Sequence, residues 1–103
     1  MSSRLEKLEA MLEADPSDTM ARYMLAMEVD KAGDHDRSLT LFETLMQHEP
    51  PYVPAFLMAG QLLVRLGRTE EAKTVYSSGI AEARQQGNDH ASGEMGQFLA
   101  ELG

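Results

Sequence analysis

The chain contains no cysteine among its 103 residues. That absence excludes disulfide bonds and thiolate metal sites. Basic residues are also scarce: 9 Lys and Arg face 17 Asp and Glu, which gives a formal net charge of −8. Nucleic acids and anionic membranes bind basic surfaces, so we expect neither class of partner. The acidity is read mainly as a contribution to solubility, with steering of a basic partner as the alternative.

Long apolar runs are missing as well. The richest run, Phe56–Leu66, is interrupted by Gln61 and Arg65 and falls short of the ~18 residues that cross a bilayer. The first residues are charged and have a helical pattern, unlike the continuous apolar segment of a signal peptide. The sequence therefore predicts a soluble, cytoplasmic protein. Roughly 100–150 residues make one domain, so a single domain is expected.

An ungapped internal repeat dominates the rest of the sequence. Shifting the chain by 34 residues aligns small, aromatic and turn residues of one segment with those of the next. The aligned pairs are Ala21 with Ala55, Ala26 with Gly60, Lys31 with Arg65, Gly33 with Gly67, Thr40 with Thr74, Leu41 with Val75 and Phe42 with Tyr76. Within each copy the apolar residues recur at steps of three and four, which indicates α-helices.

Proline and glycine mark the expected helix ends. Pro16 and Pro50 precede the first helix of each copy, where proline sacrifices no helical hydrogen bond. Gly33 and Gly67 fall where that helix must stop, because glycine readily adopts the left-handed conformation of a C-terminal cap. The caps of the following helices are predicted at Asp34 and Thr69.

The period and these residues resemble the tetratricopeptide repeat (TPR), whose unit is an antiparallel helix pair. The match covers residues 19–84. It implies an all-α, TPR-type right-handed superhelical stack of helix pairs. Small residues such as Gly60 and Ala72 would let paired helices approach closely, and aromatic residues would fill the space between pairs. Arg22 and Leu45 depart from the pattern, which prefers an aromatic and a small residue at these places.

A flanking helix is expected on each side, because two repeats alone would be marginally stable. Ser3 and Glu6 have the spacing of a capping box at the first of these helices. Gly93 and Gly96 are expected to make the last helix the most mobile one. Met95 of that helix is expected to obstruct a further helix, so that the stack ends there.

We therefore predict about six helices in a single TPR domain over residues 1–103. Its parts are an N-terminal flanking helix over 3–14, repeat 1 over 19–52, repeat 2 over 53–86 and a C-terminal capping helix over 89–102.

The resemblance also implies a ligand-binding surface on the concave side, lined by the first helix of each pair. Carrying that surface onto this sequence selects Tyr23, Met24, Met27, Asp30, Leu57, Met58, Gln61 and Val64. The result would be an apolar, methionine-rich groove for a helix or peptide of a partner protein. Two alternatives stay open. The last helix covers the groove, or a second copy pairs with the groove or the stack ends and forms a homodimer.

Residues that could carry a reaction are sparse. His35, His48 and His90 do not share a helical face and are read as solvated. Asp34-His35-Asp36 lacks the glycine and later ligands of a calcium loop. There is no phosphate-binding loop and no nucleophile elbow. We expect no catalytic activity, no cofactor and no metal. The predicted function is non-catalytic protein–protein interaction, as a scaffold, with an unidentified protein or peptide.

Overall fold

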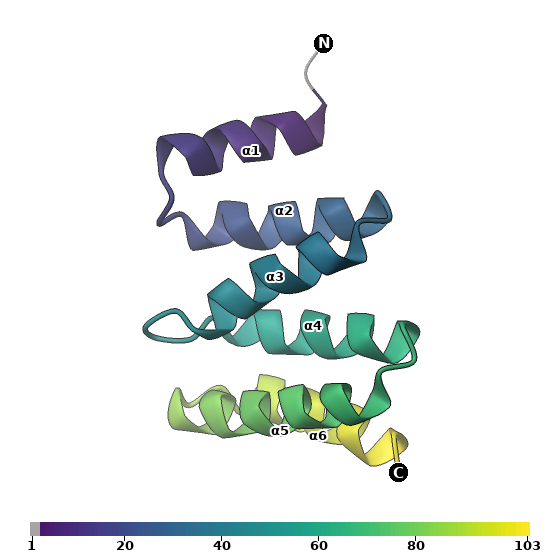
Figure 1. Ribbon diagram of the computed structural model, residues 1–103. Coiled ribbons are helices and arrows are strands. Elements are labelled where there is room, and N and C mark those ends of the chain that lie inside the picture. Colours follow the sequence, from purple (N-terminus) through teal and green to yellow (C-terminus); the bar gives the residue numbers. More distant parts are fainter. Residues whose placement is uncertain (1–2) are drawn as a thin grey trace.

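The computed structural model describes residues 3–103, which fold into six α-helices without any strand in that range (Figure 1). The helices are α1 (Arg4–Ala14), α2 (Thr19–Lys31), α3 (His35–Met46), α4 (Val53–Arg65), α5 (Thr69–Gln85) and α6 (Asp89–Glu101). The prediction of an all-α fold with about six helices is therefore confirmed.

The helices form an elongated stack that measures 45 × 29 × 18 Å. Each helix packs on the next one along the chain, so α1 lies at one end and α5 with α6 at the other (Figure 1). In addition, α6 contacts α4. None of the helices is long and apolar enough to cross a membrane within residues 3–103.

Two helices begin at the side-chain caps that the sequence predicts. The Ser3 hydroxyl accepts a hydrogen bond from the Glu6 amide, and the Asp34 carboxylate accepts one from the Arg37 amide. The predicted cap at Thr69 is wrong, because Thr69 is already the first residue of α5. The cap position is Arg68, which aligns with Asp34 in the repeat but has no side-chain acceptor.

Small residues allow close contact between paired helices. A Cβ atom added at Gly60 would lie 2.3 Å from a ring carbon of Tyr76. The hydroxyl of the fully buried Ser38 donates a hydrogen bond to the Ala26 carbonyl at 2.7 Å. These contacts explain why both copies of the repeat keep small residues there.

The predicted role of Met95 is wrong. Met95 is fully buried, and its sulfur lies beside Gly79, where an added Cβ atom would approach it to 2.6 Å. Its side chain therefore points into the stack and leaves the outer face of α6 unobstructed. The sequence misplaces it because α5 has 17 residues where α3 has 12. The linker after α5 is three residues shorter than the one after α3, so α6 begins two residues later than the repeat period predicts.

Candidate binding surface

The eight predicted groove residues lie on the neighbouring helices α2 and α4. Those on α2 are Tyr23, Met24, Met27 and Asp30, and those on α4 are Leu57, Met58, Gln61 and Val64. The structure places them in three settings: half-buried packing positions, exposed or pocket-lining positions, and an ion-pair network.

Four of the eight residues pack against the interior. Met24 contacts the small cluster that joins α1 to α2, and Leu57 and Met58 pack against the main core. The Tyr23 ring lies 6.1 Å from the Phe42 ring and 5.3 Å from the Tyr52 ring. Burial first, and then the neighbouring Tyr52, raise the pKa of Tyr23, so its phenol stays neutral.

Exposed apolar side chains occur on both α2 and α4. Met27 is 36% exposed and Val64 is 37% exposed, as expected for groove residues. Met20, which the sequence prediction missed, is the most exposed of them at 54%. Its sulfur lies 3.9 Å from the Tyr52 hydroxyl. The helical spacing of Met20, Tyr23 and Met27 was a signal that could have found it.

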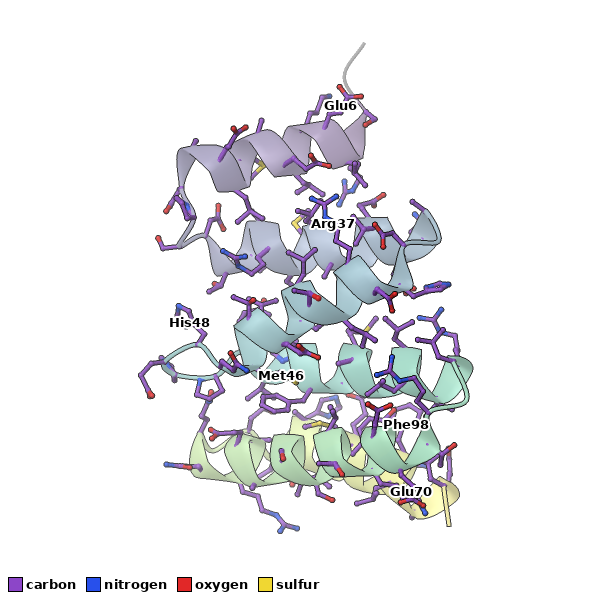
Figure 2. The ribbon with its side chains drawn as sticks, in the orientation of Figure 1. Glu6, Arg37, Met46, His48, Glu70 and Phe98 are labelled. Atoms are coloured by element: carbon purple, nitrogen blue, oxygen red, sulfur yellow. The ribbon has the colours of Figure 1, made fainter. Side chains whose placement is uncertain are left out.

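Gln61 and Val64 also line a pocket of about 370 Å³ between α4, α5 and α6. The other lining residues are Arg65, Tyr76, Phe98, Glu101 and Leu102. Phe98 of α6 points toward α4 and α5 (Figure 2) and stacks on Tyr76, with ring centres 6.0 Å apart. The lining of the pocket is largely apolar, because it includes Val64, Phe98 and Leu102.

Tyr76 contributes a buried polar group to this pocket. Its side chain is only 1% exposed. Burial is the main reason that its pKa is raised, and the nearby Glu101 carboxylate raises it further. The phenol therefore stays protonated and neutral beside the apolar wall.

Sequence reasoning missed the α6 side of this pocket because it treated that helix as a cap. The available signal was the spacing of Phe98 and Leu102, which places both side chains on one face of a helix. Val64 stays exposed beside them. In this part of the surface α6 therefore adds a wall next to α4.

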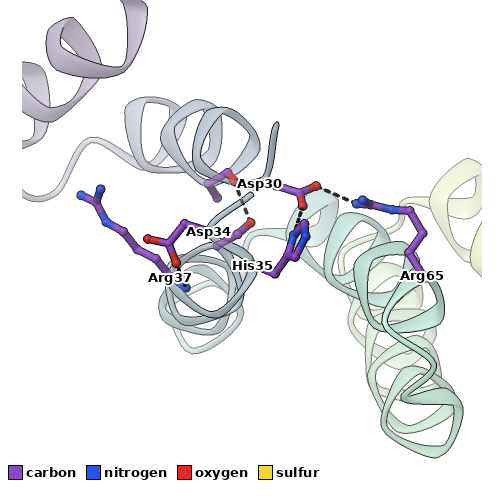
Figure 3. Close-up of polar contacts among 7 residues, drawn as sticks. Asp30, Asp34, His35, Arg37 and Arg65 are labelled. Carbon is purple, nitrogen blue, oxygen red and sulfur yellow. Dashed lines mark hydrogen bonds and ion pairs between the residues drawn. The ribbon is translucent and has the colours of Figure 1, made fainter. Parts of the chain in front are cut away.

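Asp30 is the centre of an ion-pair network that joins three helices (Figure 3). Its carboxylate accepts a hydrogen bond from Arg65 Nη2 at 2.6 Å and contacts His35 Nδ1 at 2.8 Å. Burial raises the pKa of Asp30, but the hydrogen bonds and charges of Arg65 and His35 outweigh burial and lower it overall. His35, which the sequence analysis reads as solvated, keeps 38% of its side chain exposed but also pairs with Asp30. Asp30 is therefore already occupied within the chain.

No group of three or more His, Asp or Glu side chains in residues 3–103 is arranged to hold a metal ion. The imidazole of His48 lies beside the Pro50 carbonyl, with Nδ1 at 3.2 Å from its oxygen. His90, at the start of α6, is exposed.

Comparisons with known proteins give a consistent result. The tetratricopeptide repeat family profile matches residues 31–93. A TPR repeat-containing protein of Pseudomonas aeruginosa is 26% identical over 98 residues, which cover 95% of this chain and 93% of that protein. The solution structure of a tetratricopeptide repeat domain protein from Salinibacter ruber is 36% identical with a TM-score of 0.80, covering 85% of this chain and 89% of the other. A Bordetella parapertussis protein is 26% identical with a TM-score of 0.82, covering 99% and 89%.

Proposed function

Because this chain belongs to the tetratricopeptide repeat family, whose members generally mediate protein–protein interactions, we propose that it binds a segment of a partner protein. The binding surface is the groove along α2, α4 and α6. We define this groove by the exposed residues Met20, Met27 and Val64 together with the pocket that Phe98 and Leu102 complete.

The pocket between α4 and α6 is the observation that carries the proposal. Its volume of about 370 Å³ lies within the range of small ligand sites, and its walls are mainly apolar. Binding energy in protein interfaces concentrates in a few buried anchors seated in such pockets. An apolar side chain of the partner, such as leucine, methionine or phenylalanine, therefore occupies this pocket.

The remaining groove residues set the kind of segment that continues from this anchor. Met27 and Met20 supply further exposed apolar side chains on α2, and methionine adapts its shape to different apolar contacts. A helix or an extended peptide with spaced apolar residues has the matching form. The net charge of −8 disfavours an acidic segment, so the flanks of the ligand are neutral or basic.

The structure guides the choice of test variants. Met24 and Met58 pack against the interior, so charged substitutions there would disturb folding as well as binding. Val64→Asp and Met27→Asp alter exposed groove positions instead. Ala81→Asp is the matched control, because Ala81 is exposed on α5 and lies outside the groove.

The test is quantitative capture of proteins from the source lysate by the immobilised chain and its variants. We expect at least one protein to be retained by the native chain and by Ala81→Asp, but to fall about tenfold with either groove variant. Circular dichroism checks that helicity is equal in all four. Equal retention by the native chain and both groove variants would contradict the proposal.

A further inference from the structure

We propose that the outer face of α6 binds α1 of a second copy, so that the protein associates head to tail. We define the outer face by Gly93 and Gly96, with Leu99 and the largely buried Ser92 at its edge. It is a different surface from the pocket between α4 and α6, and the proposal does not depend on what the groove binds.

Helix α6 has the register of α2 and α4, the first helices of the two repeats. A glycine with positive φ follows fifteen residues after each N-cap residue. These pairs are Asp18 with Gly33 (φ 93°), Tyr52 with Gly67 (φ 76°) and Asn88 with Gly103 (φ 84°). Residues of the three helices can therefore be compared by their distance from the N-cap.

At the eighth residue after the N-cap, the second helix of a pair crosses the first. Ala26 contacts Ser38 there, and Gly60 contacts Tyr76. The equivalent residue of α6 is Gly96, and a Cβ atom added at Gly96 or at Gly93 would meet nothing within 4 Å. Glycine weakens a helix, yet no packing inside the described molecule requires it at these two positions.

Leu99 supports the same comparison. It is the eleventh residue after its N-cap, where Val29 is 1% exposed and Leu63 is 4% exposed. Leu99 packs against the main core, yet it is only partly buried. The outer face therefore has the composition of a helix-packing surface without a helix on it.

Helix α1 has the register of the second helix of a repeat. Leu8 precedes Phe42 by the repeat period, and Met11 precedes Leu45 by the same distance. Leu45 is 1% exposed, whereas Met11 is 48% exposed. The side chain of Met11 therefore protrudes from α1 at a position that packs against a first helix elsewhere in the chain.

The sizes of the side chains are complementary between the two ends. In the second repeat, Gly79 packs against the large Phe56, the fourth residue after its N-cap. The equivalent pair across the proposed interface is Met11 of α1 with Ser92 of α6. The large residue is therefore on the second helix here, whereas in the second repeat it is on the first helix. Antiparallel docking also brings the exposed Lys7 of α1 toward the C-terminal end of α6, where the helix dipole is negative.

A second copy is therefore the occupant that these residues favour. Such a contact joins two different surfaces and leaves one α1 and one outer face free at the ends of every assembly. Association of this type continues beyond a dimer unless the ring closes.

The test is the solution mass of the chain, by sedimentation velocity over a dilution series. Two variants remove one surface each: Gly96→Leu fills the outer face, and Met11→Glu charges the protruding side chain. Both positions are open in the monomer, so folding should be preserved, and circular dichroism checks it. The control is Gln97→Leu, because the ninth residue after the N-cap is not covered in α2, where Met27 is exposed.

We expect the native chain and Gln97→Leu to grow past the dimer with concentration, and each interface variant to stay monomeric. An equal mixture of Gly96→Leu and Met11→Glu should form a heterodimer and grow no further, because the first keeps an intact α1 and the second an intact outer face. A native chain that is monomeric at every concentration would overturn the proposal. So would a Met11→Glu variant that still self-associates, or a mixture that stays monomeric.

Discussion

Glycines at different places in this molecule have opposite effects on packing. Gly60 lies against the Tyr76 ring, and Gly79 lies against Phe56 and Met95. At these two positions any side chain would force neighbouring atoms to move. Gly96, by contrast, faces open space in the monomer. The same residue type is therefore a steric requirement inside the stack and a local weakness at its end.

A pair of alanine substitutions tests this difference. We expect Gly60→Ala to lower the free energy of unfolding by about 1–3 kcal/mol, because the new Cβ atom overpacks the contact with Tyr76. Gly96→Ala should raise it by about 0.5–1 kcal/mol, because alanine favours the helix and meets no neighbour. Urea unfolding of both variants at low protein concentration measures the two changes. A Gly60→Ala variant as stable as the native chain would contradict the packing argument.

Asp30 gives a prediction on pH. Its folded-state pKa is lowered, so its charged form contributes stability above its unfolded pKa, and this contribution is lost as the pH falls through the folded value. We expect Asp30→Asn to lower the free energy of unfolding by roughly 1 kcal/mol at pH 7. The difference from the native chain should shrink below about pH 4.

Denaturant unfolding of both proteins between pH 7 and pH 3 measures this difference. Glu13→Gln, at an exposed position on α1, is the control for the loss of one acidic charge. A stability loss that is the same at pH 3 as at pH 7 would show that charge on Asp30 is not its source.

At the scale of the helices, the two repeats differ in how their second helix begins. Asp34 caps α3, whereas Arg68 at the equivalent position of α5 offers no acceptor and pairs with Glu71 instead. We expect Asp34→Ala to cost about 1 kcal/mol of stability. Arg68→Ala should cost clearly less, because it removes only an exposed ion pair. Equal losses in thermal or urea unfolding would argue against the cap as the cause.

The attachment of α1 sets an expectation for dynamics. Its only fully buried residue is Leu8, which packs with Leu25 and Val29 in a cluster separate from the main core. From the sequence alone, Gly93 and Gly96 predict that α6 is the most mobile helix. Packing now favours α1 instead, because α6 buries Met95 and lays further apolar residues on the main core.

Hydrogen exchange of backbone amides distinguishes the two helices. We expect the amides of α1 to exchange faster than those of α6, and both faster than those around Phe42 in α3. Faster exchange in α6 than in α1 would instead support the prediction from sequence, in which Gly93 and Gly96 make α6 the most mobile helix. The comparison should use Met11→Glu at low concentration, so that association does not protect either end.

The sequence predicted the helices well because the repeat aligns the same packing residues twice. The close approach of paired helices at Gly60 is one such contact, and the small residue predicts it. The neighbour of Gly60 is Tyr76 of the same pair, whereas the aromatic residues were expected between pairs. The face of α6 could not be foreseen, because the longer α5 and the shorter linker after it place α6 two residues out of the period. For the same reason, the contribution of Phe98 to the pocket was missed. Periodicity places a residue on a helix face, but the neighbour of that face depends on the whole stack.

At the scale of the whole molecule, the stack separates two kinds of surface. The groove residues lie along its side, where an apolar pocket is open between α4 and α6. The outer face of α6 and the protruding Met11 lie at its two ends. Stacked repeats contact only their neighbours, so changes at the ends should leave the pocket unaltered. Self-association and partner binding are therefore separable by mutation.

The central claim is that the pocket lined by Val64, Phe98 and Leu102 anchors an apolar side chain of a peptide ligand. The most direct measurement is amide NMR titration of the chain with a peptide selected on it from a random library, repeated with Val64→Asp. We predict shifts concentrated around these three residues and an affinity about tenfold weaker in the variant. Shifts confined to other faces, or equal affinity for the variant, would contradict the claim.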